Sequence, residues 1–349
     1  MKQDDNHTSR TSRSTLFCHL RFPAVNWSRL ALVAGALTLT GLIPGALSAL
    51  AESKSIVVVR QQDDKNSKRL IRGIKSTFKR SNQNAVIDII TISTLPNGNR
   101  SLFDSLRLLN PSIIVPLGSH ITTLISDSIH DAPLVFGAVI QPESSGFIKS
   151  KERPGGNITG ASLDISPALQ FKYFKQIYPN LHKLGIIYSD ETARIIPHAK
   201  VVAKAAGIEL YALKVEQRAG RANGRAVKKA LDSLLQVVDG LWSLADPAIF
   251  SRVSTKLLVR QTIANKVPFM GFSSTVVASG ALFALDFDYK DIGRQVGELC
   301  ERVLSGESPG ALPVTSPDIV WFHYNEITSS RIAVSIPEEL RAVAKEVYK

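Results

Sequence analysis

The chain contains 349 residues, of which 44% are hydrophobic and 21% are charged, and its formal net charge is +12 at pH 7. This composition is typical of a globular protein with one large or two ordinary domains, and it excludes a disordered or fibrous chain. The basic residues are spread out and are not interleaved with aromatic residues. The positive charge therefore favours a solvated surface over a nucleic-acid interface, with weak attraction to anionic ligands or membranes as a secondary interpretation.

Residues 1 to 51 have the organisation of a secretory signal peptide. A cationic polar region (1–29) precedes an apolar run (30–47), and Ala49 and Ala51 occupy the small-residue positions of a cleavage site. We predict cleavage after Ala51 and export of the remaining chain. An uncleaved membrane anchor is the alternative, because the polar region is long and glycines and a proline interrupt the apolar run. Cys18 precedes the apolar run, which excludes a lipoprotein signal.

From residue 55, short runs rich in β-branched residues alternate with stretches of helical periodicity. The first array comprises strand 56–60, helix 66–81, strand 86–92, strand 113–117, helix 122–129 and strand 134–140. The second array comprises helix 168–177, strand 183–188, helix 197–206, strand 209–215, helix 225–238, strand 240–244, helix 251–265 and strand 268–272. Apolar strands separated by helices predict parallel sheets covered on both faces, and two such arrays predict two lobes.

The last part of the chain does not continue this alternation. We expect an amphipathic helix at 290–304, a linker rich in Gly, Pro and Ser at 305–317, a strand at 319–324 and a helix at 337–347. These additions indicate that the chain returns to complete lobes already begun. Cys300 falls on the apolar face of the helix at 290–304. As the only cysteine of the expected mature chain it cannot form an internal disulfide, and the pattern favours a buried thiol over a reactive one.

The candidate binding residues follow the strands, because open α/β sheets bind ligands at the carboxyl ends of their strands and two facing lobes form a clamp. Gly118 and Ser119 open a helix after a buried strand, so their backbone N–H groups and the helix dipole suit a carboxylate. A plain N-cap is the alternative. Asp246 occupies the corresponding position in the second lobe, where its carboxylate either pairs with an amino group or caps a helix.

Four further residues are candidates for ligand contact. Tyr188 and Ser189 end a strand and suit stacking or hydrogen bonding, although a tyrosine that merely fills the strand end is the simpler interpretation. Gln141 and Ser273 also follow strands and have weaker claims. The sequence has no G-x-S-x-G, H-E-x-x-H or P-loop lysine motif and no Cys/His cluster with zinc spacing, so we expect neither an enzyme nor a metal or cofactor site.

The stretch E-R-P-G-G-N-I-T-G at 152–160 is the most unusual local feature of the chain. It lacks the lysine and the preceding strand of a phosphate-binding loop, and its sequon at Asn157 has meaning only in a glycosylating secretory pathway. Its glycines allow positive φ, and its proline restricts the backbone conformation at the start of the turn. We therefore expect a turn that leads into a crossover between the lobes.

This turn and three other stretches carry a resemblance to a known family. The others are P-L-V-F-G-A-V-I-Q-P at 133–142, F-K-Y-F-K-Q-I-Y-P-N-L-H-K-L-G-I-I-Y at 171–188 and D-Y-K-D-I-G-R-Q-V-G-E-L-C-E-R-V-L-S-G at 288–306. They resemble the ABC transporter substrate-binding proteins of the group that includes tryptophan and tyrosine binders. The resemblance implies an α/β, two-lobed type I periplasmic-binding-protein fold, in which each lobe is a parallel sheet flanked by helices and three crossovers join the lobes.

The same resemblance implies a domain division and a function. Residues 53–160 with 279–320 would form one lobe, and residues 161–278 with 321–349 the other. The protein would be a monomeric periplasmic component of an ABC transporter that captures a small ligand between its lobes. Its partner would be an inner-membrane ABC permease with its ATPase, and it would bind no nucleic acid. A periplasmic sensor that signals to a membrane receptor through the same clamp is the alternative.

We expect an amino-acid-like ligand, with its carboxylate at Gly118 and Ser119 and its ammonium group near Asp246. Two departures from the family pattern bear on this expectation. Gln141 stands where many relatives have the aspartate of a Thr-Asp-Pro sequence, and Pro247 stands where an aromatic-amino-acid binder of this group is expected to have asparagine.

Overall fold

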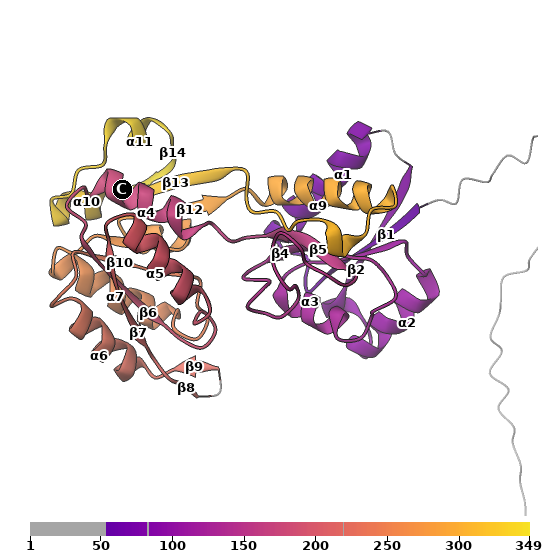
Figure 1. The fold of residues 1–349 in the computed structure, drawn as a ribbon, viewed down its shortest axis with the longest axis horizontal. Helices are drawn as coiled ribbons and strands as arrows, with labels where there is room; N and C mark the ends of the chain where they lie inside the picture. Colours follow the sequence, from indigo (N-terminus) through magenta and orange to yellow (C-terminus); the bar gives the residue numbers. More distant parts are fainter. Residues whose placement is uncertain (1–53, 82–83, 219) are drawn as a thin grey trace, which may run out of the picture. The chain divides into compact units, whose positions relative to one another are not determined.

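The computed structural model describes residues 54–81, 84–218 and 220–349. The expected signal peptide, its cleavage site after Ala51 and Cys18 lie outside the described residues. The described chain forms two lobes, each built on one central sheet, together with a short antiparallel pair of β8 (Gln217–Arg218) and β9 (Arg221–Ala222) (Figure 1). None of the helices within these ranges has the length and apolar character needed to cross a membrane.

The first lobe contains a five-stranded parallel sheet in the order β2-β1-β3-β4-β5. Its strands are β1 (Lys54–Arg60), β2 (Ala85–Thr91), β3 (Ile113–Pro116), β4 (Leu134–Val139) and β5 (Ile158–Ser162). The interior of β1 is continuously apolar because both of its faces are covered. Ile56 and Val58 pack into one hydrophobic cluster, and Val57 and Val59 pack into a second cluster on the opposite face.

Helices cover both faces of this sheet. They are α1 (Lys65–Ser81) and α9 (Tyr289–Leu304) on one face, and α2 (Asn99–Leu109) and α3 (Ser119–Ser126) on the other. Helices α1 and α9 cross at close range because Gly73 and Gly293 carry no side chain at the contact. A Cβ atom added to Gly293 would lie 1.9 Å from the Leu70 carbonyl oxygen. Cys300 is fully buried in α9, as predicted, and this burial raises the pKa of its thiol.

The second lobe contains a seven-stranded sheet in the order β14-β13-β12-β11-β10-β6-β7, which is parallel except between β12 and β13. The strands are β6 (Lys183–Tyr188), β7 (Glu209–Lys214), β10 (Gly240–Trp242), β11 (Phe269–Gly271), β12 (Phe283–Phe287), β13 (Val320–Asn325) and β14 (Ala344–Tyr348). The helices are α4 (Pro167–Ile177), α5 (Ile195–Ala205), α6 (Gly224–Leu234), α7 (Arg252–Ala264), α8 (Ser274–Ala278), α10 (Glu326–Ile332) and α11 (Glu338–Ala342). Helices α4 and α5 cover one face of the sheet, and α6, α7 and α8 cover the other.

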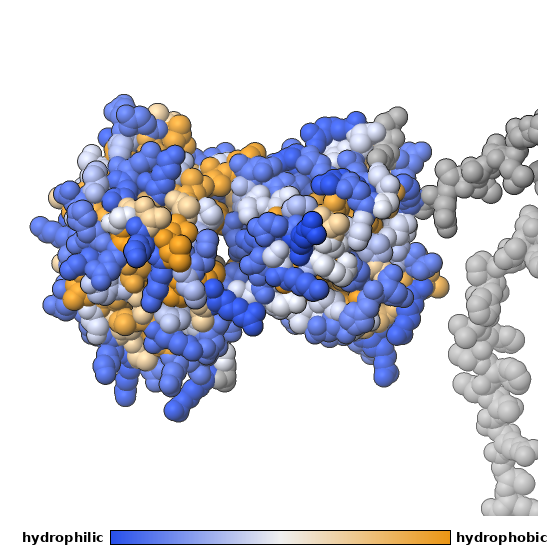
Figure 2. All heavy atoms as spheres, viewed as in Figure 1, coloured by the Kyte–Doolittle hydropathy of each residue, from blue (hydrophilic) through white to orange (hydrophobic). Residues whose placement is uncertain are grey.

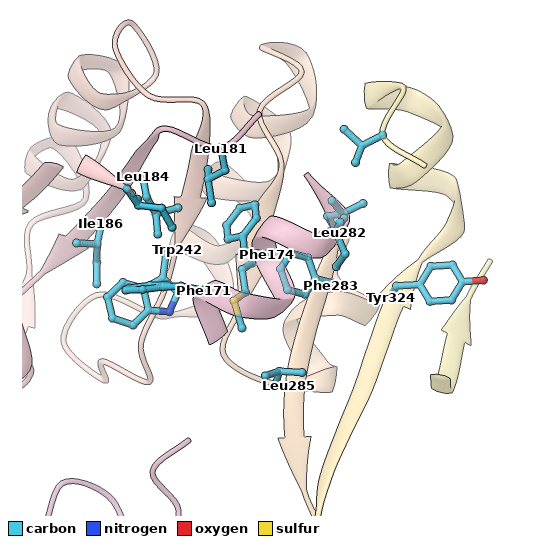
Figure 3. Packing of buried hydrophobic residues seen from close by; sticks show 14 of the residues in the cluster. Phe171, Phe174, Leu181, Leu184, Ile186, Trp242, Leu282, Phe283, Leu285 and Tyr324 are labelled. Carbon is cyan, nitrogen blue, oxygen red and sulfur yellow. The ribbon is translucent and has the colours of Figure 1, made fainter. Parts of the chain in front are cut away.

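Aromatic side chains form the centre of the second lobe (Figure 3). The indole N–H of Trp242 donates a hydrogen bond of 2.7 Å to Gln170 Oε1, and the ring of Phe171 meets the indole edge-on with centroids 4.9 Å apart. Phe174 packs in the same way against Phe283, at 5.1 Å. Full burial of such a side chain stabilises the fold by about 2 kcal/mol. The cluster therefore holds α4 firmly on strands β10 and β12.

The C-terminal segment differs from the helix predicted at 337–347. The structure has only the short helix α11, followed by β14, which pairs in parallel with β13. The prediction was wrong because a few alternating charged and apolar residues fit a helical period and a strand period equally well. Pairing with the open edge of β13 satisfies the backbone groups of both strands, and this tertiary contact decides the outcome.

Strand β12 was not predicted either, and it moves the expected boundary between the lobes. The family resemblance implied that 279–320 belong to the first lobe, whereas β12 pairs with β11 and β13 of the second sheet. The chain therefore enters the first lobe only after Phe287. The described chain passes between the lobes three times: after β5, after β12 and before β13.

The glycine-rich turn leads into the first of these crossings. Gly155 and Gly156 have φ values of 75° and 66°, as predicted for a turn that requires positive φ. Strand β5 begins two residues later, and the chain leaves the first sheet at its end.

Candidate functional site

A cavity of about 920 Å³ is lined by residues of both lobes. The first lobe contributes the start of α1 and the segment after β4. The second lobe contributes the loops after β10 and β11 and parts of β12, β13 and β14. Hydrophilic residues dominate the surface seen in Figure 2, and apolar residues gather on part of the second lobe. Strand ends are where α/β sheets bind ligands, and the cavity volume suits a small molecule.

Two of the predicted site residues, Gln141 and Ser273, line this cavity. Gln141 follows β4 with a φ of 51°, and its backbone N–H donates a hydrogen bond of 2.9 Å to Asp164 Oδ1. Its side chain is 8% exposed, and its Oε1 atom has no hydrogen-bond partner among the described residues. Ser273 precedes α8 in the second lobe. The structure thus brings one predicted residue of each lobe to the same cavity.

Gly118 and Ser119 do not line the cavity. Gly118 has a φ of 87° and precedes α3, as expected of a residue that opens a helix. Ser119 is the first residue of α3, and its hydroxyl accepts a hydrogen bond of 3.4 Å from the backbone N–H of Ile140, which does line the cavity. Ser119 therefore supports the wall through Ile140 without lining the cavity itself.

Asp246 is 1% exposed and does not line the cavity. Its carboxylate accepts hydrogen bonds from the backbone N–H and hydroxyl of Ser189 and from the hydroxyl of Thr192, at 2.7 to 2.9 Å. It also accepts from the backbone N–H groups of Ala248 and Ile249. This arrangement matches the capping alternative and not the predicted pairing with an amino group, because protein donors already surround both oxygens.

Ser189 and Tyr188, which end β6, have structural contacts as well. Ser189 is fully buried and joins β6 to Asp246 after β10. Tyr188 is half-buried and packs against the hydrophobic core of the second lobe. This packing agrees with the simpler interpretation, in which the tyrosine fills the end of the strand. Neither Tyr188 nor Ser189 lines the cavity.

Sequence reasoning missed a group of polar and aromatic residues on β12, β13 and β14 and at the first residue of α9, which together form what we call the β12–β14 wall. The group consists of Asp286, Tyr289, Trp321, His323, Lys345 and Glu346. No strand was predicted at β12, and a helix was predicted where β14 lies. For this reason no pattern in the sequence placed Asp286 and Glu346 on strands that flank the same neighbour, β13.

The ionisable groups of this wall are strongly influenced by burial. Burial raises the pKa of Tyr289 to about 12, with a smaller contribution from the charge of Asp286. Burial lowers the pKa of His323, against the opposing effect of Asp286 and Glu346. Burial and a hydrogen bond to Glu346 together raise the pKa of Tyr348 to about 12. At neutral pH, therefore, the tyrosines and the histidine are uncharged, and the charged side chains of this wall are the carboxylates of Asp286 and Glu346 and the ammonium group of Lys345.

Several cations of the cavity have other partners. Lys151 lies 3.0 Å from Asp164, and Arg69 lies 2.9 Å from Asp288. Arg69 also lies over one tryptophan ring of the cavity, Trp321, at 5.6 Å from its centroid. The cavity therefore has compensated charges near the first and second crossovers and a negative region on the β12–β14 wall.

The family model for ABC transporter substrate binding proteins matches residues 98–348 of the chain. The tyrosine-binding protein of Clostridioides difficile (strain R20291) is 28% identical over 268 residues, which cover 76% of this chain and 75% of that relative.

Two solved structures are similar in fold. One is an ABC domain in complex with L-Trp from Streptococcus pneumonia, at 20% identity and a TM-score of 0.62, covering 84% of this chain and 99% of that chain. The other is the ligand-free, open structure of a substrate-binding protein with adhesive properties from Clostridium difficile, at 19% identity and a TM-score of 0.69, covering 85% of this chain and 100% of that chain.

The two sheets with their flanking helices and these structural matches confirm the predicted type I periplasmic-binding-protein fold. The family match spans the segment after β4, the first crossover and the β12–β14 wall, which together line most of the cavity. The chain belongs to the ABC transporter substrate-binding protein family.

Proposed function

We propose that this protein is the exported solute-binding component of an ABC transporter, which captures a small amino-acid-like ligand between its two lobes and delivers it to a membrane permease. One observation carries the proposal: in a member of a substrate-binding family, both lobes contribute walls to a cavity of about 920 Å³. A ligand that contacts both walls favours the closed arrangement of the lobes, because these contacts form together only when the lobes meet.

Gln141 and Ser273 are the predicted residues best placed to contact the ligand, since they line the cavity from different lobes. The unpartnered Oε1 atom of Gln141 supports this role. A buried acceptor without a partner costs about 1–3 kcal/mol, and a ligand N–H or O–H group that reaches it during closure offsets this cost. We therefore expect Gln141 to contribute to the affinity for the ligand as well as to the shape of the cavity.

The amino-acid class of the ligand is supported by two similar proteins. The relative from Clostridioides difficile is named a tyrosine-binding protein, and the Streptococcus structure contains L-Trp. The cavity also carries both carboxylates and cationic side chains, as Asp286 and Lys65 exemplify. Walls with both signs of charge suit a zwitterion, whose two charged ends form charge-assisted hydrogen bonds.

The proposal is tested by native mass spectrometry of the freshly purified chain, followed by a thermal-shift screen of L-amino acids. A true ligand at 100 times its Kd is expected to stabilise the folded state by about 2.7 kcal/mol. Gln141→Ala should weaken binding, whereas Arg107→Ala, at an 81% exposed side chain on α2, should leave it unchanged. A flat response to every L-amino acid contradicts the ligand class. Unchanged uptake of an identified ligand in cells lacking the protein contradicts delivery to a permease.

A further inference from the structure

We propose that Asp286 and Glu346, with His323 between them, form a subsite that binds the protonated amine of the solute. The inference rests on the proposed function and adds to it the position of the ligand's positive charge. It differs from the expectation that Asp246 holds this charge, because the Asp246 carboxylate is already surrounded by protein donors.

Three neighbouring strands place the subsite on one wall of the cavity. His323 on β13 pairs in register with Ala284 of β12 on one side and with Glu346 of β14 on the other. The Nδ1 atom of His323 lies 3.7 Å from Glu346 Oε2, and Asp286 is close enough for its charge to act on the imidazole. All three side chains of the subsite line the cavity.

The two carboxylates carry negative charge that no lysine or arginine of the described chain compensates through an ion pair. Asp286 accepts hydrogen bonds from the backbone N–H and hydroxyl of Ser274 and from the backbone N–H of Phe287. Glu346 accepts a hydrogen bond of 2.6 Å from the hydroxyl of Tyr348. These neutral donors satisfy lone pairs but leave the charge in place, so a cation that enters the cavity is attracted to this wall.

Two cations that line the cavity near the subsite have partners of their own. The ammonium group of Lys345 lies 4.6 Å from the centroid of the Trp321 ring, and Arg69 pairs with Asp288. Both cations therefore have attractive partners of their own. Lys345 offsets part of the negative charge, but the two carboxylates outnumber it, so the β12–β14 wall stays negative on balance.

The buried ring of His323, whose nitrogens have no partner in the described part of the chain, independently indicates a polar ligand. The side chain is 3% exposed, and neither ring nitrogen has a hydrogen-bond partner among the residues that the structure describes. Because burial lowers the pKa of His323, the imidazole is neutral and offers one nitrogen as an acceptor. A primary ammonium group has three N–H donors, which equals the number of acceptor groups formed by the two carboxylates and this nitrogen.

Aromatic rings of the same wall favour a cation over a neutral donor. Trp321, Tyr289 and Phe287 line the cavity, and the last two pack edge-on with ring centroids 5.2 Å apart. The faces of such rings attract cations, most strongly where water is excluded. Tyr289 stays uncharged throughout the physiological range because its pKa is raised to about 12, so it does not compete for the amine as an anion.

The test is isothermal titration calorimetry on the full chain without residues 1–51, with three kinds of probe. The first is the panel of L-amino acids, the second is the primary amines tyramine and putrescine, and the third is 3-(4-hydroxyphenyl)propionate, which lacks an amine. Asp286→Asn is expected to weaken amine-bearing probes by about tenfold, the loss typical of one charge-assisted hydrogen bond. Glu346→Gln is expected to weaken them by about threefold, because this side chain is 59% exposed and its charge is screened. Asp104→Asn, on the outer helix α2, is the matched control with unchanged affinity.

The outcomes separate this inference from the proposed function. Binding of an amino acid with equal affinity by the wild type, Asp286→Asn and Glu346→Gln overturns the subsite and leaves the solute-binding function intact. Binding of tyramine or putrescine but of no amino acid, with the expected sensitivity to Asp286→Asn, supports the subsite and overturns the amino-acid class. If no amine-bearing probe binds to the folded wild type, the subsite is wrong. Glu346→Gln keeps the test decisive if Asp286→Asn does not fold.

Discussion

The carboxylate of Asp246 accepts one hydrogen bond from the backbone N–H of Ser189 and another from its hydroxyl, each 2.9 Å long. These bonds join the ends of β6 and β10, which are neighbours in the second sheet. Asp246→Ala should lower the free energy of unfolding by about 3 kcal/mol, because several buried donors lose their acceptor. Urea unfolding with an unchanged m-value measures this loss. Asp246→Asn keeps one acceptor and should lose less, and an alanine variant as stable as the wild type contradicts the structural role.

The crossing of α1 and α9 gives a second prediction. Gly293→Ala should lower the free energy of unfolding by about 3 kcal/mol or more, because the new Cβ would overlap the Leu70 carbonyl oxygen and the helices would have to separate. Gly224→Ala is the matched control, since a Cβ at Gly224 meets no atom within 4 Å. The control should be neutral or slightly stabilising. Equal unfolding midpoints for the two variants would show that the crossing is not tightly packed.

His323 gives a prediction about pH. Burial lowers the pKa of His323 from 6.5, the charges of Asp286 and Glu346 partly oppose this effect, and the charge of Lys345 adds the smallest contribution, which also lowers the pKa. At pH values between the pKa of His323 in the folded protein and 6.5, the unfolded state binds more protons than the folded state. The free energy of unfolding that neutral His323 contributes is therefore fully present above pH 6.5 and is lost as the pH falls to the folded-state pKa.

His323→Phe removes the titrating group and keeps an aromatic ring of similar breadth. Its free energy of unfolding should therefore depend less on pH than that of the wild type when both are measured from about pH 8 to about pH 5. Parallel slopes for the two proteins over this range count against a neutral, buried His323.

Tryptophan fluorescence should report ligand binding. In the chain without residues 1–51 the tryptophans are Trp242, which is 1% exposed, and Trp321, which lines the cavity. A ligand is expected to change the emission of the wild type, and Trp321→Phe should remove the change. Trp242→Phe should keep it, although the lost hydrogen bond to Gln170 and the lost contacts should lower the free energy of unfolding by about 2 kcal/mol. A ligand-dependent signal that survives Trp321→Phe places the binding site elsewhere.

The parts of the fold that the sequence predicted are those whose local pattern has one interpretation. The apolar run of β1 and the long amphipathic face of α9 fit only a buried strand and a packed helix. β12 and β14 are short, and their formation depends on pairing with β13. The residues of β12 and β14 do not by themselves indicate that they pair with β13, so neither strand was predicted.

In the candidate site, too, the residues that were predicted are those with a clear local pattern, and the others depend on tertiary contacts. Gln141 and Ser273 could be predicted because each follows a recognisable strand, and both line the cavity. Asp246 was found for the same reason, but its two possible roles differ only in which donors surround the carboxylate, and this depends on the meeting of β6 and β10. Asp286 and Glu346 lie on strands that only the tertiary structure reveals.

The contact between α1 and α9 also has a consequence for the order of folding. The hydroxyl of Thr77 on α1 donates a hydrogen bond to the carbonyl of Arg294, which lies 217 residues later in the chain. A chain made from its N-terminus therefore exposes the apolar face of α1 until almost all of the protein has emerged. Contacts between such distant segments form slowly, and the apolar face of α1 is prone to aggregation while it remains exposed. The first lobe, although it begins the chain, should be the last to complete its core.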